Sequence, residues 1–411
     1  MKRRDFILRT LSLGISFLIS TQGFADDKKL PFLLVVHCDG GWDQNMVFDN
    51  KKSVPKADYE TDVTVKSGAG GISYLASPSR PLTSSFFDTY GDNALILNGV
   101  YNPSLSYEKA LLSSVAGYNT RTGYFTDWLA FYAAQVAPDL SMPYVAIGAP
   151  YVAYHNGSFI TYLDNSIIKN FQTSPLSDVV AFKVEEEAAL IEYINWSHQA
   201  ASTRLNQDID RDKFKTFSSS LLKDASIEKA VRALKISDTD DELTKHGKIA
   251  LNFFKQGYTQ AASIQSGAKG SWNTHSDHYA SQTKNFEALF TGLSHIISEA
   301  KTLEIDQNLV IIVKSELGRS SVLNVAKGKD RWPYTSVLIW SPLVKGGKVL
   351  GKTDDQFLGV PIDPLFGDYE GSQPKEMLTL GHIYAAFFEY AGVSAKLIQT
   401  LGSPALFLMK I

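Results

Sequence analysis

The stretch LVIIV at residues 309–313, followed by Lys314-Ser315-Glu316-Leu317-Gly318-Arg319, decides the fold class. An uninterrupted apolar run of this length predicts a buried strand. Polar side chains directly after the carboxyl end of a strand mark the place where open α/β sheets bind ligands. A second polar run, residues 270–278, opens a predicted helix that leads into this strand. We therefore expect the two segments to contribute to one site at one edge of a sheet.

Other apolar runs predict the rest of the sheet. Residues 32–36 read as a central parallel strand that is buried on both faces, and residues 94–97 and 337–340 as further strands. Helical periodicity dominates between them. The fold class expected is α/β, with a central, mostly parallel sheet flanked by helices. Helices are expected at residues 185–205, 212–234, 240–265, 282–301 and 382–391.

The composition is that of a large globular domain. With 411 residues, 44% of them hydrophobic, the chain can bury a large core. We expect a single domain at residues 26–411, with a helical insertion at about 185–266 whose segments 212–234 and 240–265 form a lid or cap. The formal charge is −3, and it becomes about −6 without the leader, so nucleic acid is not an expected partner. Cys38 is the single cysteine, which excludes an internal disulfide.

The amino-terminal residues resemble an export signal. Lys2-Arg3-Arg4-Asp5-Phe6 has the twin-arginine layout, and a short apolar run and a small-residue cleavage site ending at Ala25 follow it. We expect residues 1–25 to be a signal peptide that directs the protein to the periplasm or the cell exterior. The apolar run is shorter than the ~20 residues that cross a bilayer, and no later segment is long and apolar enough to do so.

Several short motifs occur in an order that resembles a known family. They are Gly40-Gly41-Trp42-Asp43, Ser271-Trp272-Asn273-Thr274-His275, Ser315-Glu316-Leu317-Gly318-Arg319, Gly328-Lys329-Asp330-Arg331 and Val344-Lys345-Gly346-Gly347. In this order the chain resembles the exported family known as domain of unknown function 1501, which is similar to sulfatases and alkaline phosphatases. The resemblance implies an alkaline phosphatase-like fold and a metal-assisted hydrolase of phosphate or sulfate esters.

Three positions depart from the family pattern. Asn273 stands where the pattern has a carboxylate, Arg331 where it has a histidine, and Tyr107 where it has the histidine of a Ser-His-Glu element. Arginine carries a fixed positive charge and cannot bind a metal. An intact two-metal centre is therefore not expected, and at most one tightly bound divalent metal is, whether zinc, manganese or calcium.

The candidate metal ligands are carboxylates and imidazoles at strand ends and helix starts. These are Asp39, Asp43, His275, His278 and Asp330. Imidazole and carboxylate oxygen suit zinc or manganese, and His275 and Asp330 match the family's own residues. We expect them to meet in one crevice. The alternative is that the aspartates bond turn amides and that the histidines only flank a helix cap.

The candidate catalytic residues lie at two other places. Ser104 and Ser106 precede a predicted helix, where an alkaline phosphatase-like enzyme keeps its hydroxyl nucleophile, although serine is also a routine helix cap. Glu316 and Arg319 follow the strand at 309–313, where Arg319 could hold an anion and Glu316 could bind a metal or orient Arg319. A structural salt bridge is the alternative for this second pair.

Two functions remain open from the sequence. The first is the exported, metal-assisted ester hydrolase. The second is a catalytically degenerate protein on the same scaffold, which binds an envelope glycan or an anionic small molecule. Trp42, Trp272 and Trp332 each lie in a motif and could line a sugar-binding cleft, or they could simply be buried in the core.

Overall fold

The computed structural model describes residues 30–52, 54–117, 127–140, 142–151, 160–165, 168, 239–364, 367, 375–393 and 403–410. The expected signal peptide at 1–25 and the expected helices at 185–205 and 212–234 lie outside the described residues. Residues Pro31–Ile411 form one compact unit.

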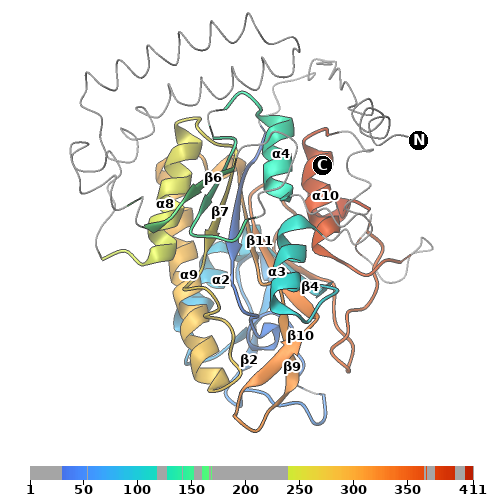
Figure 1. The fold of residues 1–411 in the computed structure, drawn as a ribbon. Coiled ribbons are helices and arrows are strands. Elements are labelled where there is room, and N and C mark those ends of the chain that lie inside the picture. The colour runs from blue at the N-terminus through green and yellow to red at the C-terminus, as the bar shows by residue number, and fades with distance from the viewer. Residues whose placement is uncertain are drawn as a thin grey trace, which may run out of the picture. The chain divides into compact units, whose positions relative to one another are not determined.

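A central sheet of eight strands organises the fold (Figure 1). Their order across the sheet is β12 (Lys348–Leu350), β4 (Ala94–Tyr101), β11 (Tyr334–Trp340), β8 (Leu309–Lys314), β1 (Phe32–His37), β7 (Ala261–Gln265), β5 (Tyr144–Ile147) and β6 (Ile160–Leu163). Among these strands β11 alone is antiparallel to its neighbours, and every other adjacent pair is parallel. The expected α/β fold with a mostly parallel sheet is confirmed.

The strands that were expected from apolar runs are all present. The predictions for 32–36, 94–97, 309–313 and 337–340 correspond to β1, β4, β8 and β11. In β1, Leu33 to Val36 are completely buried, which explains the absence of polar residues from that run.

One helix prediction is wrong in its second half. The segment 240–265 is helix α8 (Glu242–Lys255) followed by the buried strand β7, and is not one helix. Asp241 caps α8 by accepting a hydrogen bond from the Thr244 backbone N–H at 3.0 Å. Because β7 lies between β1 and β5 and contacts α8, this segment belongs to the main layers and is not a lid.

Helices cover both faces of the sheet (Figure 1). On one face α9 (His278–Thr302) packs against α8 and α2 (Pro81–Tyr90), with Phe290 of α9 in contact with Phe86 of α2. On the other face are α3 (Tyr107–Ala116), α4 (Trp128–Val136) and α10 (Leu380–Tyr390). There Trp128 stacks on Tyr384, with ring centroids 3.9 Å apart.

The long helix α9 follows directly from its sequence. Phe286, Leu289, Phe290, Leu293 and Ile297 are buried, and their spacing places them on one stripe of a helix. The helix contains the expected segment 282–301, and α10 likewise matches the expected helix at 382–391. The sheet is thus fixed between two helical layers, which holds the carboxyl ends of its strands in place.

Two hairpins and five short 3₁₀ helices complete the described part of the chain. The hairpins are β2 (Thr64–Ser67) with β3 (Ser73–Ala76), and β9 (Gly318–Leu323) with β10 (Lys329–Trp332). The 3₁₀ helices are η1 (Gln44–Met46), η2 (Ala69–Gly71), η3 (Gly91–Asn93), η5 (Asp306–Asn308) and η6 (Leu406–Leu408). Among the described residues, no helix has the length and apolar character needed to cross a membrane.

Candidate functional site

Asp39 and Glu316 lie side by side at the carboxyl edge of the sheet. They follow the paired parallel strands β1 and β8, whose register sets His37 opposite Lys314. Glu316 Oε1 accepts the Gly40 N–H at 2.8 Å, and Ser315 Oγ donates to the Cys38 carbonyl at 2.7 Å. Gly40 has a φ of 124°, and a Cβ there would lie 2.5 Å from the Asn273 backbone nitrogen, so only glycine fits.

The Asp39 carboxylate is occupied by protein donors. The Tyr107 hydroxyl lies 2.5 Å from Asp39 Oδ1 and 2.7 Å from Oδ2, and the Gly270 N–H donates to Oδ2 at 3.1 Å. The Arg331 guanidinium lies over the Tyr107 ring, 5.6 Å from its centroid, in a cation–π contact. A hydroxyl supported by a fixed cation therefore faces Asp39, in the place where a metal-binding site would need an open position.

Two buried groups beside Asp39 titrate near neutral pH. Burial and the neighbouring Asp39 charge raise the pKa of Glu316 to about 7. Burial lowers the pKa of Lys314 to about 7, although the Glu316 charge opposes this change. Lys314 Nζ donates to Ser114 Oγ of α3 at 2.9 Å. The edge of the sheet thus holds a carboxyl group and an amine whose protonation states change near neutral pH.

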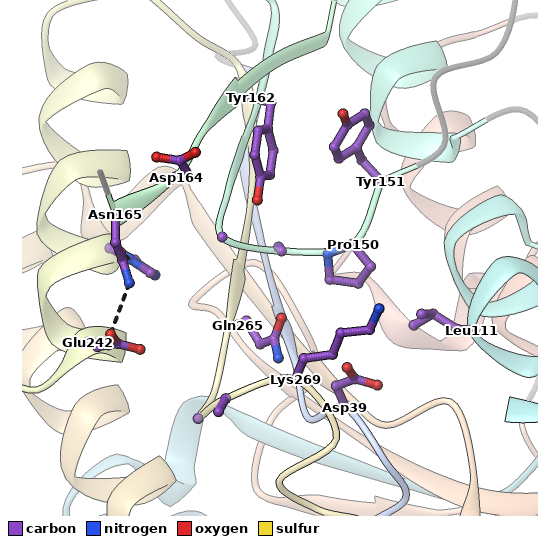
Figure 2. Close-up of a pocket in the computed structure, with 15 residues that line it drawn as sticks. Asp39, Leu111, Pro150, Tyr151, Tyr162, Asp164, Asn165, Glu242, Gln265 and Lys269 are labelled. Atoms are coloured by element: carbon purple, nitrogen blue, oxygen red, sulfur yellow. Dashed lines mark hydrogen bonds between the residues drawn. The ribbon is translucent and has the colours of Figure 1, made fainter. Parts of the chain in front are cut away.

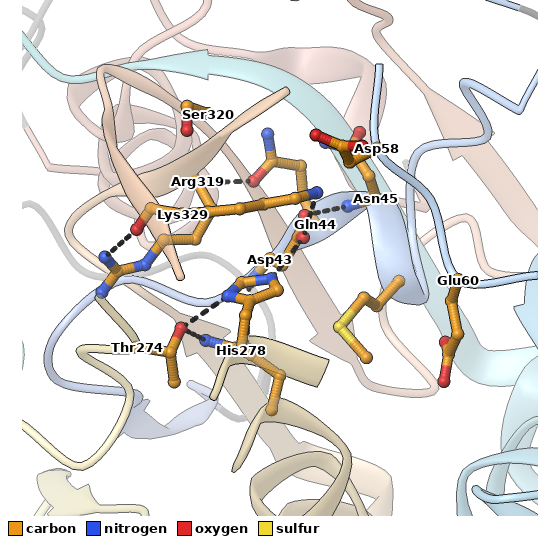
Figure 3. A network of polar contacts seen from close by, with 12 residues as sticks. Asp43, Gln44, Asn45, Asp58, Glu60, Thr274, His278, Arg319, Ser320 and Lys329 are labelled. Atoms are coloured by element: carbon orange, nitrogen blue, oxygen red, sulfur yellow. Dashed lines mark hydrogen bonds and ion pairs between the residues drawn. The ribbon is translucent and has the colours of Figure 1, made fainter. Parts of the chain in front are cut away.

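Asp43 and His278 belong to a separate buried network (Figure 3). Asp43 Oδ2 accepts from Lys329 Nζ at 2.8 Å and lies 2.7 Å from His278 Nε2, and Thr274 Oγ1 lies 2.8 Å from His278 Nδ1. Burial would raise the pKa of Asp43, but Lys329 and the His278 hydrogen bond outweigh it and hold that pKa well below its ordinary range. The network joins η1, α9 and β10, and its side chains are almost completely inaccessible to solvent.

His275 and Asp330 lie on the surface instead. His275 Nδ1 is 3.3 Å from Asp330 Oδ1, and the two side chains are 43% and 68% exposed. A pair this exposed contributes about 0–1 kcal/mol to stability. The five expected metal ligands therefore divide among three places: Asp39 at the sheet edge, Asp43 with His278 in the interior, and His275 with Asp330 on the surface.

The residues present do not fit a resident metal. Among the residues that the structure describes, no group of three or more His, Cys, Asp or Glu side chains could hold a metal ion. Asp39 and Glu316 come nearest, but Tyr107 and Gly40 already donate to them. The expectation that the five ligands form one centre is not met, because Asp39 bonds Tyr107, Asp43 pairs with His278, and His275 pairs with Asp330.

Of the other expected catalytic residues, Arg319 is engaged within the protein, whereas the Ser106 side chain is exposed. Buried Arg319 donates to the carbonyls of Gly41, Lys329 and Trp272 and to Asn273 Oδ1, so it joins loops of the protein and does not present itself to an anion. Ser106 is exposed at the start of α3 without a side-chain capping bond, and Ser104 Oγ accepts the Ser106 N–H at 3.1 Å.

The tryptophans do not line a cleft together. Trp42 and Trp272 are 0% and 1% exposed and pack edge to face, with centroids 6.2 Å apart. Half-buried Trp332 donates its indole N–H to the Phe357 carbonyl at 2.7 Å. Trp42 and Trp272 are therefore buried core residues and do not line a sugar-binding cleft.

A pocket of about 640 Å³ opens beyond Asp39 at the carboxyl ends of β1, β7, β5 and β6 (Figure 2). Its wall includes the rings of Tyr151 and Tyr162, whose centroids are 5.1 Å apart. In Figure 2 these rings lie at one end, Asp39 and Lys269 at the other, and Gln265 between them. Its charged lining consists of Asp39, Asp164, Glu242 and Lys269, and the imidazole of His246 also borders it.

Two buried polar atoms of the pocket wall find no hydrogen-bond partner among the described residues. They are Nε2 of Gln265, at the end of β7, and Nδ1 of His246, on α8. The two residues are 8% and 5% exposed. An unpartnered buried polar group costs roughly 1–3 kcal/mol, so each of the two atoms calls for a partner such as water or a ligand.

The sequence motifs did not indicate most of this site. Gln265 lay inside an expected helix, and His246, Tyr151 and Tyr162 belong to no motif. Tyr107 was visible as a departure from the family pattern, but its pairing with Asp39, 68 residues away, depends on the sheet.

The chain matches known proteins in its three-dimensional structure and not in its sequence. No family model matches the chain, and no curated protein matches it. Membership of the domain of unknown function 1501 family therefore stays a prediction.

Matching structures include members of the alkaline phosphatase superfamily. The lipoteichoic acid synthase LtaP from Listeria monocytogenes is 9% identical, with 92% of this chain and 76% of that chain covered and a TM-score of 0.42. A protein in the alkaline phosphatase superfamily from Vibrio parahaemolyticus is 10% identical, with 92% and 70% covered and a TM-score of 0.42. The C-terminal periplasmic domain of EcEptC from Escherichia coli, in complex with zinc, is 9% identical, with 77% and 75% covered and a TM-score of 0.37.

Proposed function

We propose that this chain is a ligand-binding protein on an alkaline phosphatase-like scaffold, and that it acts without a resident metal. This is the second of the two functions that the sequence left open. The observation that carries it is the Tyr107 hydroxyl, which lies within 2.7 Å of both oxygens of Asp39. A metal ion bound to both Asp39 oxygens would have to displace this hydroxyl.

The charge of the pocket disfavours an anionic ligand. Its wall carries the three carboxylates Asp39, Asp164 and Glu242 against one ammonium group, that of Lys269. A phosphate or sulfate ester would meet net repulsion there. Of the two ligand classes expected from the sequence, an envelope glycan, if it is uncharged, therefore agrees better with the pocket than an anionic small molecule.

The hydrolase hypothesis has less support from the same residues. Ester hydrolysis by this scaffold depends on cations that activate the nucleophile and screen the charge of the ester. Asp43, His278 and Arg319 are bonded within the protein, and Arg331 lies over Tyr107. None of these described groups is free to perform that chemistry.

Metal analysis combined with an ester assay tests the proposal. Purified wild-type protein should contain far less than one zinc, manganese or calcium ion per chain, and it should not hydrolyse p-nitrophenyl phosphate or p-nitrophenyl sulfate. Tyr107→His should bind zinc in equilibrium dialysis, because it adds an imidazole beside Asp39 and Glu316. Tyr107→Phe is the matched control, since it removes the hydroxyl without adding a ligand. Stoichiometric metal and turnover in the wild type would overturn the proposal.

We also propose that the protein is exported by the twin-arginine route, on the basis of the leader sequence at residues 1–25. Replacing Arg3 and Arg4 with lysine should then leave precursor in the cytoplasm, as detected by immunoblotting of cell fractions. Unchanged export of this variant would exclude that route.

A further inference from the structure

The pocket wall offers a hydrogen-bond donor and an acceptor that the protein leaves unused. Gln265 Nε2 belongs to an amide NH₂ group, so it can only donate. The role of His246 follows from its neighbours: Asn165 Nδ2 donates to Glu242 Oε1 at 2.9 Å, which directs Asn165 Oδ1 toward His246 Nε2 at 2.6 Å. A carbonyl oxygen can only accept, so Nε2 carries the hydrogen.

The unpartnered His246 Nδ1 is therefore an acceptor. Burial lowers the pKa of His246, which keeps the ring neutral and its Nδ1 lone pair available. Gly148, with a φ of 59°, borders this ring, since a Cβ there would lie 3.0 Å from His246 Cε1. An amide donor and an imidazole acceptor are both groups that hydrogen-bond hydroxyls, since a hydroxyl donates and accepts.

The tyrosines provide the complementary apolar surface. Tyr151 and Tyr162 are each 39% exposed, and their rings are inclined by 35°. Exposed aromatic faces beside hydrogen-bonding groups suit a ligand with an apolar face and hydroxyl edges. The pocket volume of about 640 Å³ lies within the range of small-molecule sites.

We infer that this pocket is a saccharide-binding site for a neutral sugar, in which Gln265 and His246 offer a donor and an acceptor to sugar hydroxyls and Tyr151 and Tyr162 pack against the ring. The inference rests on the proposed function and names its ligand class. The excess of carboxylates over ammonium groups disfavours sulfated or phosphorylated sugars.

The test begins with an array of neutral gluco-, galacto-, manno- and N-acetylglucosamine oligosaccharides, alongside sulfated forms of the same sugars. Wild-type protein should bind at least one neutral sugar, and more tightly than its sulfated form. The tightest ligand is then titrated calorimetrically against variants. Gln265→Leu, and separately the double variant Y151A/Y162A, should each weaken binding by about tenfold or more.

The matched control is the double variant Y101A/Y334A. That pair has almost the same geometry, with centroids 5.2 Å apart and rings inclined by 38°, and it does not line the pocket. It should bind as the wild type does, with thermal unfolding used to verify that every variant is folded. A deoxy analogue that lacks the bonded hydroxyl should lose affinity for the wild type but not for Gln265→Leu.

Two results would overturn the inference. One is the absence of binding to every neutral sugar at millimolar concentration, and the other is wild-type affinity in both Gln265→Leu and Y151A/Y162A. If the protein is also free of metal and hydrolyses no ester, either result rejects the sugar site but leaves the proposed function standing. Stoichiometric metal with ester turnover rejects the proposed function instead.

Discussion

Glu316 is a carboxyl group that the fold buries beside a second carboxylate, Asp39. Its folded-state pKa of about 7 is above the ordinary value of 4.5, so the folded state binds this proton more tightly than the unfolded state does. The stabilisation from the protonated form is complete below about pH 4.5 and is lost as the pH rises to about 7. The pKa of Lys314 is lowered to about 7, so the folded state binds this proton less tightly than the unfolded state does. The contribution of Lys314 to stability therefore rises as the pH increases above about 7.

The free energy of unfolding should therefore fall between about pH 4.5 and pH 7, by roughly 3 kcal/mol at 1.36 kcal/mol per pKa unit. Glu316→Gln cannot titrate and should remove this decline. Urea denaturation across the pH range measures it, with exposed Glu304→Gln as the control that keeps the wild-type curve. A parallel decline in Glu316→Gln and the control would mean that other groups cause it.

At the scale of single residues, motifs were a poor guide to role. Arg319 and Asp43 were expected to face a ligand because they follow strands, yet their charges are bonded to backbone carbonyls and to Lys329. Side-chain partners depend on segments far apart in the chain, such as Gly41 and Arg319, 278 residues apart. Local patterns carry no information on that pairing.

At the scale of elements, the Asp43 network connects β10 and α9 to η1. Lys329 of β10 and His278 of α9 meet on one carboxylate that caps η1. Lys329→Met would remove the ammonium group that pairs with the buried Asp43 carboxylate. The loss of one member of a buried pair costs about 3–5 kcal/mol.

We therefore expect Lys329→Met to lower the free energy of unfolding by about that amount in urea titrations. Exposed Lys327→Met, on the adjoining turn, is the control and should change it by less than about 0.5 kcal/mol. The double variant D43N/K329M removes both charges and should recover part of the loss. If Lys329→Met is as stable as the control, the ion pair does not support the hairpin.

Element prediction succeeded where burial alone determines the sequence. β1 and β8 are strings of large apolar residues because each has strands on both sides and helices on both faces. β7, with the sequence AASIQ, was missed because its small and polar residues lack that signature. Its strand conformation comes from pairing with β1 and β5, which no local pattern encodes.

At the scale of the whole molecule, the single cysteine reports on the integrity of the sheet. Cys38 is completely buried at the end of the central strand β1, between the residues that hold Asp39 and Glu316 in place. Burial and the Glu316 charge raise the pKa of its thiol well above the ordinary range, which suppresses the reactive thiolate. A reagent can reach it only when β1 separates from its neighbours.

Labelling of Cys38 by a maleimide should therefore follow global unfolding. In a urea series the labelled fraction should rise with the same midpoint as the circular dichroism signal, because strand β1 is paired on both edges. A saturating sugar ligand of the pocket should shift both midpoints upward together. Rapid labelling of native protein without denaturant would instead show that the sheet edge around Asp39 opens locally. The contact between the Tyr107 hydroxyl and Asp39 would then be broken in part of the folded population.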